Sequence, residues 1–433
     1  MRIRFGTDGV RGVANRELAP EHALALGLAA ARLFGGPLAV GRDTRLSGGM
    51  LSAALAAGAA SGGSEVLDLG VLPTPGVAAL VGELGGAAAA VISASHNPYP
   101  DNGIKFLSRE GRKLPDGLER ELEHLVESTF DDRPAGAGVG GIKRIEDAAG
   151  RYAGFLAARI RPRAGGMRVL LDCANGAAYR VAPLAFERTG ADLTIVCGDP
   201  DGTNINRGCG STHVEGLDVR GHDVAFAFDG DADRVLAVDE TGSVVDGDRI
   251  IAILARDLKE RGELSGGVVV TVMSNLGFFK AMEGLNIPVE VTPVGDRHVA
   301  EAMRKTGAAV GGEQSGHIIL SRYTTTGDGI LTALALLEVM VRSGRPLSEL
   351  ARVMEVYPQR LINVRVKDRS VAGDGAVRRA VRSAEERLGK EGRILLRPSG
   401  TEPVVRVMVE HVDEEVCRTV CEEVAGVVER AGA

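Results

Sequence analysis

The chain has 433 residues, 44% of them hydrophobic and 25% charged, a globular composition whose length predicts about two to four domains. Acidic residues outnumber basic ones by 58 to 51, so the net charge of −7 disfavours a general nucleic-acid binder. Aromatic residues make up only 3% and tryptophan is absent, which argues against aromatic stacking as the main binding device.

The N-terminal segment is not typical of a targeting signal, because it reaches charged residues and glycines at once. The most apolar early stretch, residues 22–40, is interrupted by Arg32, Gly35, Gly36 and Pro37, so it is too broken for a membrane span. The five cysteines are odd in number and scattered, which is typical of reduced thiols. We therefore expect a soluble cytoplasmic protein without a membrane partner or a disulfide framework.

Short apolar runs alternate with helical patterns in the first part of the chain. Pro20 opens a helical pattern that Gly35 closes. The elements expected after it are a strand at 38–43, a helix at 48–61, a strand at 65–70, a helix after Pro75 and a strand at 87–93. Strands that alternate with helices predict a mostly parallel α/β domain.

The alternation of apolar strands with helices continues beyond a Gly- and Pro-rich segment at 131–141. This segment is the best linker candidate. Helices are expected at 146–160, 249–262 and 328–343, and strands at 167–172, 192–198, 223–229, 267–273 and 288–295. From about Tyr357 the pattern changes to three strands and two helices, typical of a smaller α+β domain. We predict four domains, at 1–141, 142–246, 247–356 and 357–433.

The first motif with chemical content is VISASHNPYPDNGIKF, residues 91–106. An apolar strand runs into a loop of small residues around Ser95 and His96, which Pro98 stiffens, and a second strand follows. In an open α/β sheet ligands bind beyond the carboxyl ends of the strands, so this loop is a candidate ligand site. A plain capping loop explains these residues as well, because a Ser-His dipeptide alone does not make a nucleophile–base pair.

Three closely spaced aspartates, Asp229, Asp231 and Asp233, form the second motif at the end of an apolar strand. Their like charges repel one another unless a cation binds, and their oxygen ligands favour Mg2+ or another hard cation over zinc. An EF-hand calcium loop is a rival interpretation, since Glu240 stands where such a loop ends. However, Arg234 occupies the position of its glycine, and strands flank the motif. A solvated acidic turn is the second rival.

The third motif, RPSGTEPVVRVM, concentrates groups that suit a phosphate dianion: two guanidinium forks, two hydroxyls and a glycine backbone. They belong to Arg397, Ser399, Gly400, Thr401 and Arg406. A hairpin with ordinary surface arginines is the alternative. The sequence has no GxxxxGK[ST] loop and no GxGxxG fingerprint after a strand, which disfavours an ATP-dependent kinase.

The fourth motif, GGEQSGHII, places a carboxylate, an amide, a hydroxyl and an imidazole on a glycine-flanked turn. These groups belong to Glu313, Gln314, Ser315 and His317. Short polar side chains of this kind suit the hydroxyls of a sugar. Glycine-rich polar turns are also common as ordinary loops, so this motif indicates little by itself.

Taken together and in this order, the four motifs resemble those of the alpha-D-phosphohexomutase superfamily. The resemblance spans the whole chain, from FGTDGVRG near the start to RPSGTEP near the end. Within the superfamily the chain is most similar to the bacterial amino-sugar branch, through RFGTDGVRG, SASHNP and GEQSGH. Relatives that act on glucose or mannose phosphates usually carry Met in place of Gln314. The resemblance implies three α/β domains with mixed, mostly parallel sheets and a smaller C-terminal α+β domain around a central cleft.

The resemblance also implies roles for the residues of each motif. Ser95 would be the phosphoserine. One Mg2+ per chain would be held by the Ser95 phosphate and by Asp229, Asp231 and Asp233. Further catalytic groups would be Arg11, His96 and Lys105. The substrate would be bound by Arg234, Glu313, Ser315, His317, Arg397, Ser399, Gly400, Thr401 and Arg406. Ala232 departs from the family's usual glycine, which slightly restricts the loop but removes no ligand.

The reaction implied by the resemblance interconverts glucosamine 6-phosphate and glucosamine 1-phosphate, with glucosamine 1,6-bisphosphate as intermediate and activator. It would supply UDP-N-acetylglucosamine and cell-wall synthesis. The implied partner is a small sugar phosphate, and because relatives are often dimers, a homodimer is an expectation. Three alternatives remain: a mutase for glucose or mannose phosphates, a metal-dependent phosphatase, and a non-catalytic protein that binds sugar phosphates or calcium.

Overall fold

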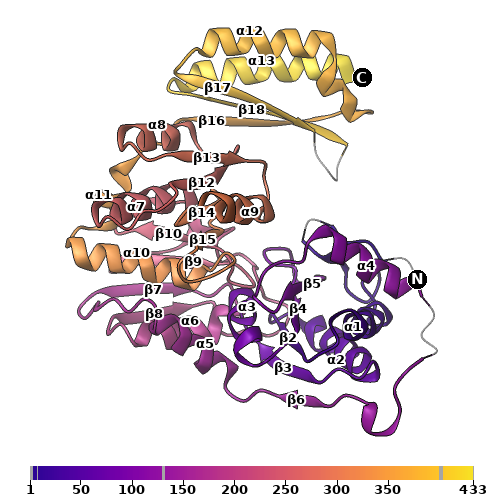
Figure 1. The fold of residues 1–433 in the computed structure, drawn as a ribbon. Coiled ribbons are helices and arrows are strands. Elements are labelled where there is room, and N and C mark those ends of the chain that lie inside the picture. Colours follow the sequence, from indigo (N-terminus) through magenta and orange to yellow (C-terminus); the bar gives the residue numbers. More distant parts are fainter. Residues whose placement is uncertain (1–2, 7, 129–131, 399–402, 433) are drawn as a thin grey trace. The chain divides into compact units, whose positions relative to one another are not determined.

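A computed structural model of the chain describes residues 3–6, 8–128, 132–398 and 403–432 (Figure 1). The chain divides into two compact units. The larger unit consists of Met1–Met273 and Ile287–Val353, and the smaller one of Ser274–Asn286 and Met354–Ala433. No helix among the described residues is long and apolar enough to cross a membrane.

The first sheet of the larger unit has the strand order β1-β5-β4-β2-β3-β6. Its strands are β1 (Val10–Val13), β2 (Leu38–Arg42), β3 (Val66–Val71), β4 (Ala88–Ile92), β5 (Asp101–Ser108) and β6 (Ile142–Arg144). Strands β2, β3 and β4 run parallel, whereas β5 is antiparallel to both β4 and β1. The carboxyl ends of β2 and β4 therefore open at the same edge of the sheet, where ligands bind in α/β folds.

Four helices accompany this sheet: α1 (Pro20–Phe34), α2 (Leu46–Ser61), α3 (Thr74–Glu83) and α4 (Asp116–Glu127). Helix α1 has the predicted limits, because Pro20 starts it and Gly35 ends it in a left-handed conformation with φ 60°. Figure 1 shows α1 beside α2, and the two backbones approach closely. A Cβ atom on Gly27 would lie 2.0 Å from the Leu55 carbonyl oxygen, so this contact requires glycine.

Two further mixed sheets complete the larger unit, with the orders β11-β10-β9-β7-β8 and β13-β12-β14-β15. The second sheet contains β7 (Arg168–Asp172), β8 (Asp192–Val196), β9 (Val224–Phe228), β10 (Val235–Asp239) and β11 (Val244–Val245). The third contains β12 (Val268–Thr271), β13 (Val289–Thr292), β14 (Val310–Gly312) and β15 (Ile318–Leu320). Their helices are α5 (Ala148–Ala157), α6 (Ala178–Glu187), α7 (Gly247–Glu260), α9 (Asp296–Thr306), α10 (Gly329–Ser343) and α11 (Leu347–Leu350).

The smaller unit is an antiparallel sheet of three strands, β16 (Gln359–Arg365), β18 (Val404–His411) and β17 (Gly392–Pro398), in that order. It also contains the helices α8 (Leu276–Gly284), α12 (Gly375–Leu388) and α13 (Glu414–Gly432). Apolar residues of β16, β18, α12 and α13 form one core. Cys417 and Cys421 are buried in this core, so they serve packing.

The predicted fold class is confirmed. Three mixed sheets with helices between their strands are followed along the chain by a smaller α+β unit with a three-stranded sheet. Some boundaries differ from the prediction: α5 starts at Ala148, after Asp147 caps it, rather than at Glu146. Residues 132–141 contain one short 3-10 turn, η1 (Gly136–Gly138), as suits a connecting segment. Strand β6 follows this segment and pairs in parallel with β3 of the first sheet. The division into four domains stays a prediction.

Candidate active site

Ser95 lies in the loop between β4 and β5, as the strand–loop–strand pattern predicted. Its side chain is buried, and its backbone has the left-handed φ of 51°, which a serine adopts only at a cost. The Ser95 hydroxyl donates a hydrogen bond of 2.6 Å to Asp229 Oδ2. The Ser95 N–H donates to Ser93 Oγ at 2.9 Å. The loop therefore holds the hydroxyl in one direction, toward the aspartates.

A buried arginine that the sequence analysis missed holds this loop from within the protein. Arg45 donates to the carbonyl oxygens of Ser95 and Asn97, at 2.8 Å each, and to that of Asp101 at 3.0 Å. Its Nε donates to Asp43 Oδ2 at 2.9 Å, and both side chains are 0% exposed. The guanidinium of Arg45 thus supplies hydrogen-bond donors to carbonyl oxygens of the loop. Both residues follow β2, so their position at the end of a strand was the available signal.

A second clamp reaches the serine loop from the connection between β8 and β9. The Asn206 amide donates to the carbonyl oxygens of Ser95 at 2.9 Å and Asn97 at 3.1 Å. The Asn206 N–H in turn donates to the Ala174 carbonyl oxygen at 2.9 Å. The loop that carries Ser95 is therefore held by a residue beside the first sheet and by one beside the second sheet. No local sequence pattern indicates this arrangement.

The three aspartates of the second motif come together directly after β9. One carboxylate oxygen from each of Asp229, Asp231 and Asp233 lies within 4.8 Å of the others, and all three residues are buried. Within the described part of the chain, the buried oxygens Oδ1 of Asp231 and Oδ1 of Asp233 accept no hydrogen bond. Buried acceptors without donors are costly, so these residues fit a divalent cation with oxygen ligands. Burial, helped by the other two carboxylates, raises the pKa of Asp229 well above its usual range.

The backbone of this motif explains how the carboxylates converge. Ala232 has a left-handed φ of 56°, a conformation that glycine adopts freely and alanine does not. The three carboxylates meet with alanine at this position, so the departure from the family's usual glycine does not prevent their convergence. Strand β10 begins at Val235 and returns antiparallel to β9, which excludes the helices that flank an EF-hand loop.

Lys105 lies on β5 and reaches the aspartates from the first sheet. Its Nζ lies 2.9 Å from Asp231 Oδ2 and 3.9 Å from Asp233 Oδ2. Burial lowers the pKa of Lys105, but the nearby carboxylates outweigh this effect and raise it above its usual value, so the group stays an ammonium. Thr74, at the start of α3, donates to Asp231 Oδ2 at 2.5 Å and was missed by the sequence analysis.

Two further predicted groups lie beside the serine loop. His96 Nδ1 is 3.4 Å from Ser95 Oγ, and burial lowers the pKa of His96, which keeps the ring neutral near pH 7. Arg11, on β1, donates to the Ala94 carbonyl oxygen at 3.3 Å and forms an ion pair with Asp8. Asp8 was not singled out by the sequence analysis, although it stands in the FGTDGVRG segment.

The fourth motif approaches the aspartates from the third sheet. His317 Nδ1 lies 3.5 Å from Asp233 Oδ2, and His317 Nε2 accepts a hydrogen bond of 3.1 Å from the Gly327 N–H. Arg234 pairs with His317 through a backbone bridge, and its own N–H donates to Asp229 Oδ1 at 3.2 Å. The structure therefore brings both predicted residues to the aspartate cluster.

The remaining residues of the fourth motif have different surroundings. Glu313 Oε1 accepts a hydrogen bond of 3.1 Å from the Gly295 N–H, and Ser315 is exposed. The Gln314 amide donates to Asp246 Oδ2 at 3.2 Å, and Asp246 is the N-cap of α7. Gln314, which indicated an amino-sugar substrate in the sequence, is thus engaged by the protein itself.

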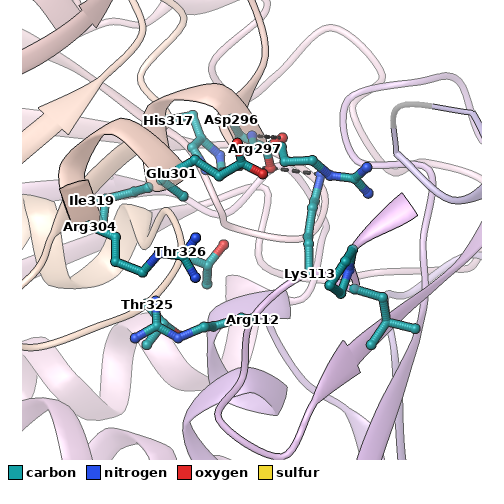
Figure 2. Close-up of a pocket in the computed structure, with 13 residues that line it drawn as sticks. Arg112, Lys113, Asp296, Arg297, Glu301, Arg304, His317, Ile319, Thr325 and Thr326 are labelled. Carbon is teal, nitrogen blue, oxygen red and sulfur yellow. Dashed lines mark hydrogen bonds and ion pairs between the residues drawn. The ribbon is translucent and has the colours of Figure 1, made fainter. Parts of the chain in front are cut away.

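A cavity of about 200 Å³ adjoins His317, and Figure 2 shows its lining. Its lining contains the basic groups Arg112, Lys113, Arg297 and Arg304 and the acidic groups Asp296 and Glu301, so basic side chains outnumber acidic ones in this pocket of a chain with negative net charge. Lys113 Nζ lies 2.7 Å from Asp296 Oδ2 at the start of α9 (Figure 2). Lys113 and Asp296 were both missed, although Asp296 follows β13 closely.

In the smaller unit, the two predicted arginines face the same side of the sheet. Arg397 of β17 and Arg406 of β18 are direct cross-strand partners, and both are half-buried. Two guanidinium groups on one face of a sheet suit the recognition of a phosphate dianion. The other predicted phosphate ligands, Ser399, Gly400 and Thr401, lie outside the described residues.

Comparison with known proteins identifies the class to which this fold and site belong. The chain matches family models described as phosphoglucomutase/phosphomannomutase alpha/beta/alpha domain I over residues 2–132, domain III over 246–357 and the C-terminal domain over 361–427. A phosphoglucomutase/phosphomannomutase family protein of Burkholderia thailandensis has the same fold, with a TM-score of 0.82 at 24% identity over 98% of this chain and 96% of that one. An N-acetylphosphoglucosamine mutase of Aspergillus fumigatus, solved with GlcNAc-6P and magnesium, shares it at 19% identity, with a TM-score of 0.74 over 100% and 96% of the chains.

A relative of much higher identity narrows the class. The phosphoglucosamine mutase of Rubrobacter xylanophilus is 70% identical over 99% of this chain and 98% of its own length. The chain therefore belongs to the phosphohexomutase superfamily and, within it, to the bacterial phosphoglucosamine mutase family. This family places the chain among the isomerases.

Proposed function

We propose that this protein is a phosphoglucosamine mutase that interconverts glucosamine 6-phosphate and glucosamine 1-phosphate by way of a phosphorylated Ser95. The observation that carries the proposal is the 2.6 Å hydrogen bond from the Ser95 hydroxyl to Asp229, inside a cluster of three buried carboxylates. The relative at 70% identity supports the amino-sugar substrate. The proposal includes a small sugar phosphate as the partner, a cytoplasmic location and the four-domain division predicted from the sequence.

In the proposed reaction, phosphorylated Ser95 gives its phosphoryl group to the free hydroxyl of the sugar. The Ser95 Oγ–P bond breaks, a new O–P bond forms, and glucosamine 1,6-bisphosphate results. After this intermediate reorients, a bond forms between Ser95 Oγ and the other phosphorus while the bond from that phosphorus to the sugar oxygen breaks. The Ser95 hydroxyl proton passes to the freed sugar oxygen, and the opposite phosphate monoester leaves. Phosphoryl transfer of this kind depends on alignment and charge neutralisation rather than on covalent chemistry by many residues.

The side chains around Ser95 divide these tasks between them. Asp229, Asp231 and Asp233 would hold Mg2+, which neutralises charge on the transferred phosphoryl group when it is bound. Lys105, an ammonium beside Asp231, adds positive charge from the first sheet. Two acceptors lie near the Ser95 hydroxyl proton when Ser95 is free: Asp229 Oδ2 at 2.6 Å and His96 Nδ1 at 3.4 Å. Arg11, His96, Arg234 and His317 would line the site.

Substrate recognition uses two separate sets of residues in this proposal. Glu313 and Ser315 would bind sugar hydroxyls in the larger unit. Arg397 and Arg406, with Ser399, Gly400 and Thr401, would bind the phosphate that does not react. The cross-strand pairing of the two arginines supports this role, because it places both side chains on one face of the sheet, where one phosphate dianion can accept hydrogen bonds from both.

The substrate is tested by measuring kcat/KM for glucosamine 6-phosphate, glucose 1-phosphate and mannose 1-phosphate, each with Mg2+ and a trace of the matching bisphosphate. We expect at least about a tenfold preference for the amino sugar, which corresponds to about 1.4 kcal/mol in transition-state binding. A preference for glucose or mannose phosphate would move the protein to another branch of the superfamily. Steady release of inorganic phosphate without isomerisation would replace the mutase by a phosphatase.

Metal dependence gives a second expected result. Removal of divalent cations with a chelator should abolish turnover, and Mg2+ should restore it. Asp231→Asn should raise the Mg2+ concentration needed for half-maximal activity by about tenfold or more, because it removes one anionic ligand. Titration of activity with Mg2+ measures this shift. Asp218→Asn is the matched control, since Asp218 is an exposed aspartate that pairs only with Arg220 in the described structure. Equal Mg2+ requirements in the two variants would contradict the assignment.

A further inference from the structure

A second group of metal-ligating side chains lies outside the proposed active site, in the second sheet of the larger unit. Asp172, Cys197 and Cys209 each offer one ligand atom, and these atoms lie within 4.8 Å of one another. Asp172 ends β7, Cys197 follows β8 directly, and Cys209 lies in the connection before β9. Three chain segments thus converge at the edge of the sheet where ligands of α/β folds bind.

The carboxylate of this cluster is fixed by backbone donors. Asp172 Oδ1 accepts a hydrogen bond of 2.8 Å from the Ala174 N–H, and Asp172 Oδ2 accepts one of 2.7 Å from the Gly210 N–H. Because Gly210 adjoins Cys209, the second bond also holds the Cys209 thiol beside the carboxylate. Outer hydrogen bonds of this kind orient the ligands of metal sites.

The donor set distinguishes this cluster from the aspartate triad. Two sulfur atoms and one carboxylate oxygen suit a borderline cation such as Zn2+, whereas three carboxylates suit Mg2+. Asp172 and Cys209 are buried, but Cys197 is partly exposed, so water can complete a fourth coordination position. Burial raises the pKa of Cys209 to about 12, so its thiol is protonated without a metal, and a cation that binds must displace the protons.

We propose that Asp172, Cys197 and Cys209 form a binding site for a zinc-class divalent cation, separate from the magnesium site of the reaction. A cation at this site would tie the segment between β8 and β9, which contains both Cys209 and Asn206, to Asp172 at the end of β7. Asn206 donates to the Ser95 carbonyl oxygen at 2.9 Å and to the Asn97 carbonyl oxygen at 3.1 Å. A cation at this position would therefore stabilise the segment that supports the serine loop, without contacting the substrate.

Cobalt(II) is the probe that separates this site from the aspartate triad. Co2+ bound to thiolates gives a sulfur-to-metal charge-transfer band in the near ultraviolet, and Co2+ bound only to oxygen does not. Titration of the full chain, reduced with a phosphine, should give this band with one equivalent of Co2+. Competing Zn2+ should remove the band, whereas Mg2+ should not.

Cysteine variants locate the band. It should weaken or disappear in Cys197→Ser and in Cys209→Ser, and it should keep the intensity of the parent in Cys417→Ser, a variant of a buried cysteine in the smaller unit. Zn2+ should raise the Tm of the parent protein by a few degrees and that of Cys197→Ser by less. Because Cys197 is partly exposed, its serine variant should fold, which circular dichroism checks. A missing band in the parent, or a band whose intensity neither Cys197→Ser nor Cys209→Ser lowers, would overturn the site. Neither result depends on mutase activity.

Discussion

Ser95→Ala is expected to lower kcat by at least about 1,000-fold, because the variant has no oxygen to carry the phosphoryl group. The substitution removes one hydroxyl that donates to Asp229 and leaves the loop contacts of the Ser95 backbone in place. The variant should therefore keep its fold and its affinity for glucosamine 1,6-bisphosphate. Turnover of glucosamine 6-phosphate, with intact mass to detect a phosphorylated chain, measures the effect.

Ser108→Ala is the matched control for this prediction. Ser108 ends β5 in the same sheet, and its hydroxyl donates to Glu110 away from the aspartates. This variant should keep the turnover of the parent and should carry the same phosphate. If Ser95→Ala kept more than about a tenth of the parent activity, the phosphoryl carrier would be another residue and the proposed mechanism would be wrong.

Much of the candidate site was predictable because its residues stand in short segments that follow buried strands. The Ser95 loop follows β4 and the aspartates follow β9, so the rule for open α/β sheets points to both. The alternation of aspartates and small residues at Asp229–Asp233 predicts a metal site by itself, because like charges at that spacing repel one another unless a cation binds. The limits of α1 were also readable, because Pro20 and Gly35 act locally.

The supporting residues were not predictable in the same way, because their roles depend on contacts between distant parts of the chain. Arg45 looks like a surface arginine in the sequence, yet it is buried against carbonyl oxygens of a loop about fifty residues further on. Asn206 reaches the same loop from the second sheet. Such partners become visible only when the sheets are placed side by side.

Gln314 shows a different limit of sequence interpretation. As a signature it separates the amino-sugar branch from its relatives, but its amide contacts Asp246 at the N-terminus of α7. In the described structure this contact holds the loop between β14 and β15 of the third sheet. Glu313 and Ser315 lie in the same loop and are expected to bind the sugar. A residue that correlates with specificity can therefore work through the shape of a loop rather than by touching the substrate.

Arg45→Met is expected to destabilise the larger unit by about 3–5 kcal/mol, the usual cost of breaking a buried ion pair on one side. Asp43, 0% exposed, would lose its charged partner, and the carbonyl oxygens of Ser95 and Asn97 would each lose a donor. Because those carbonyls belong to the serine loop, kcat should fall as well, by about tenfold or more. Urea unfolding and turnover below the transition measure the two effects.

Arg42→Met is the control that separates burial from charge. Arg42 stands on the same β2 segment, and its guanidinium lies 3.8 Å from Asp68 with both side chains more than a quarter exposed, at 27% and 29%. A partly exposed pair contributes about 0–1 kcal/mol, so this variant should unfold near the parent and keep its kcat. Equal losses in the two variants would mean that removing any cation beside β2 weakens the sheet. A loss confined to Arg45 would show that the buried guanidinium holds the loop that presents Ser95.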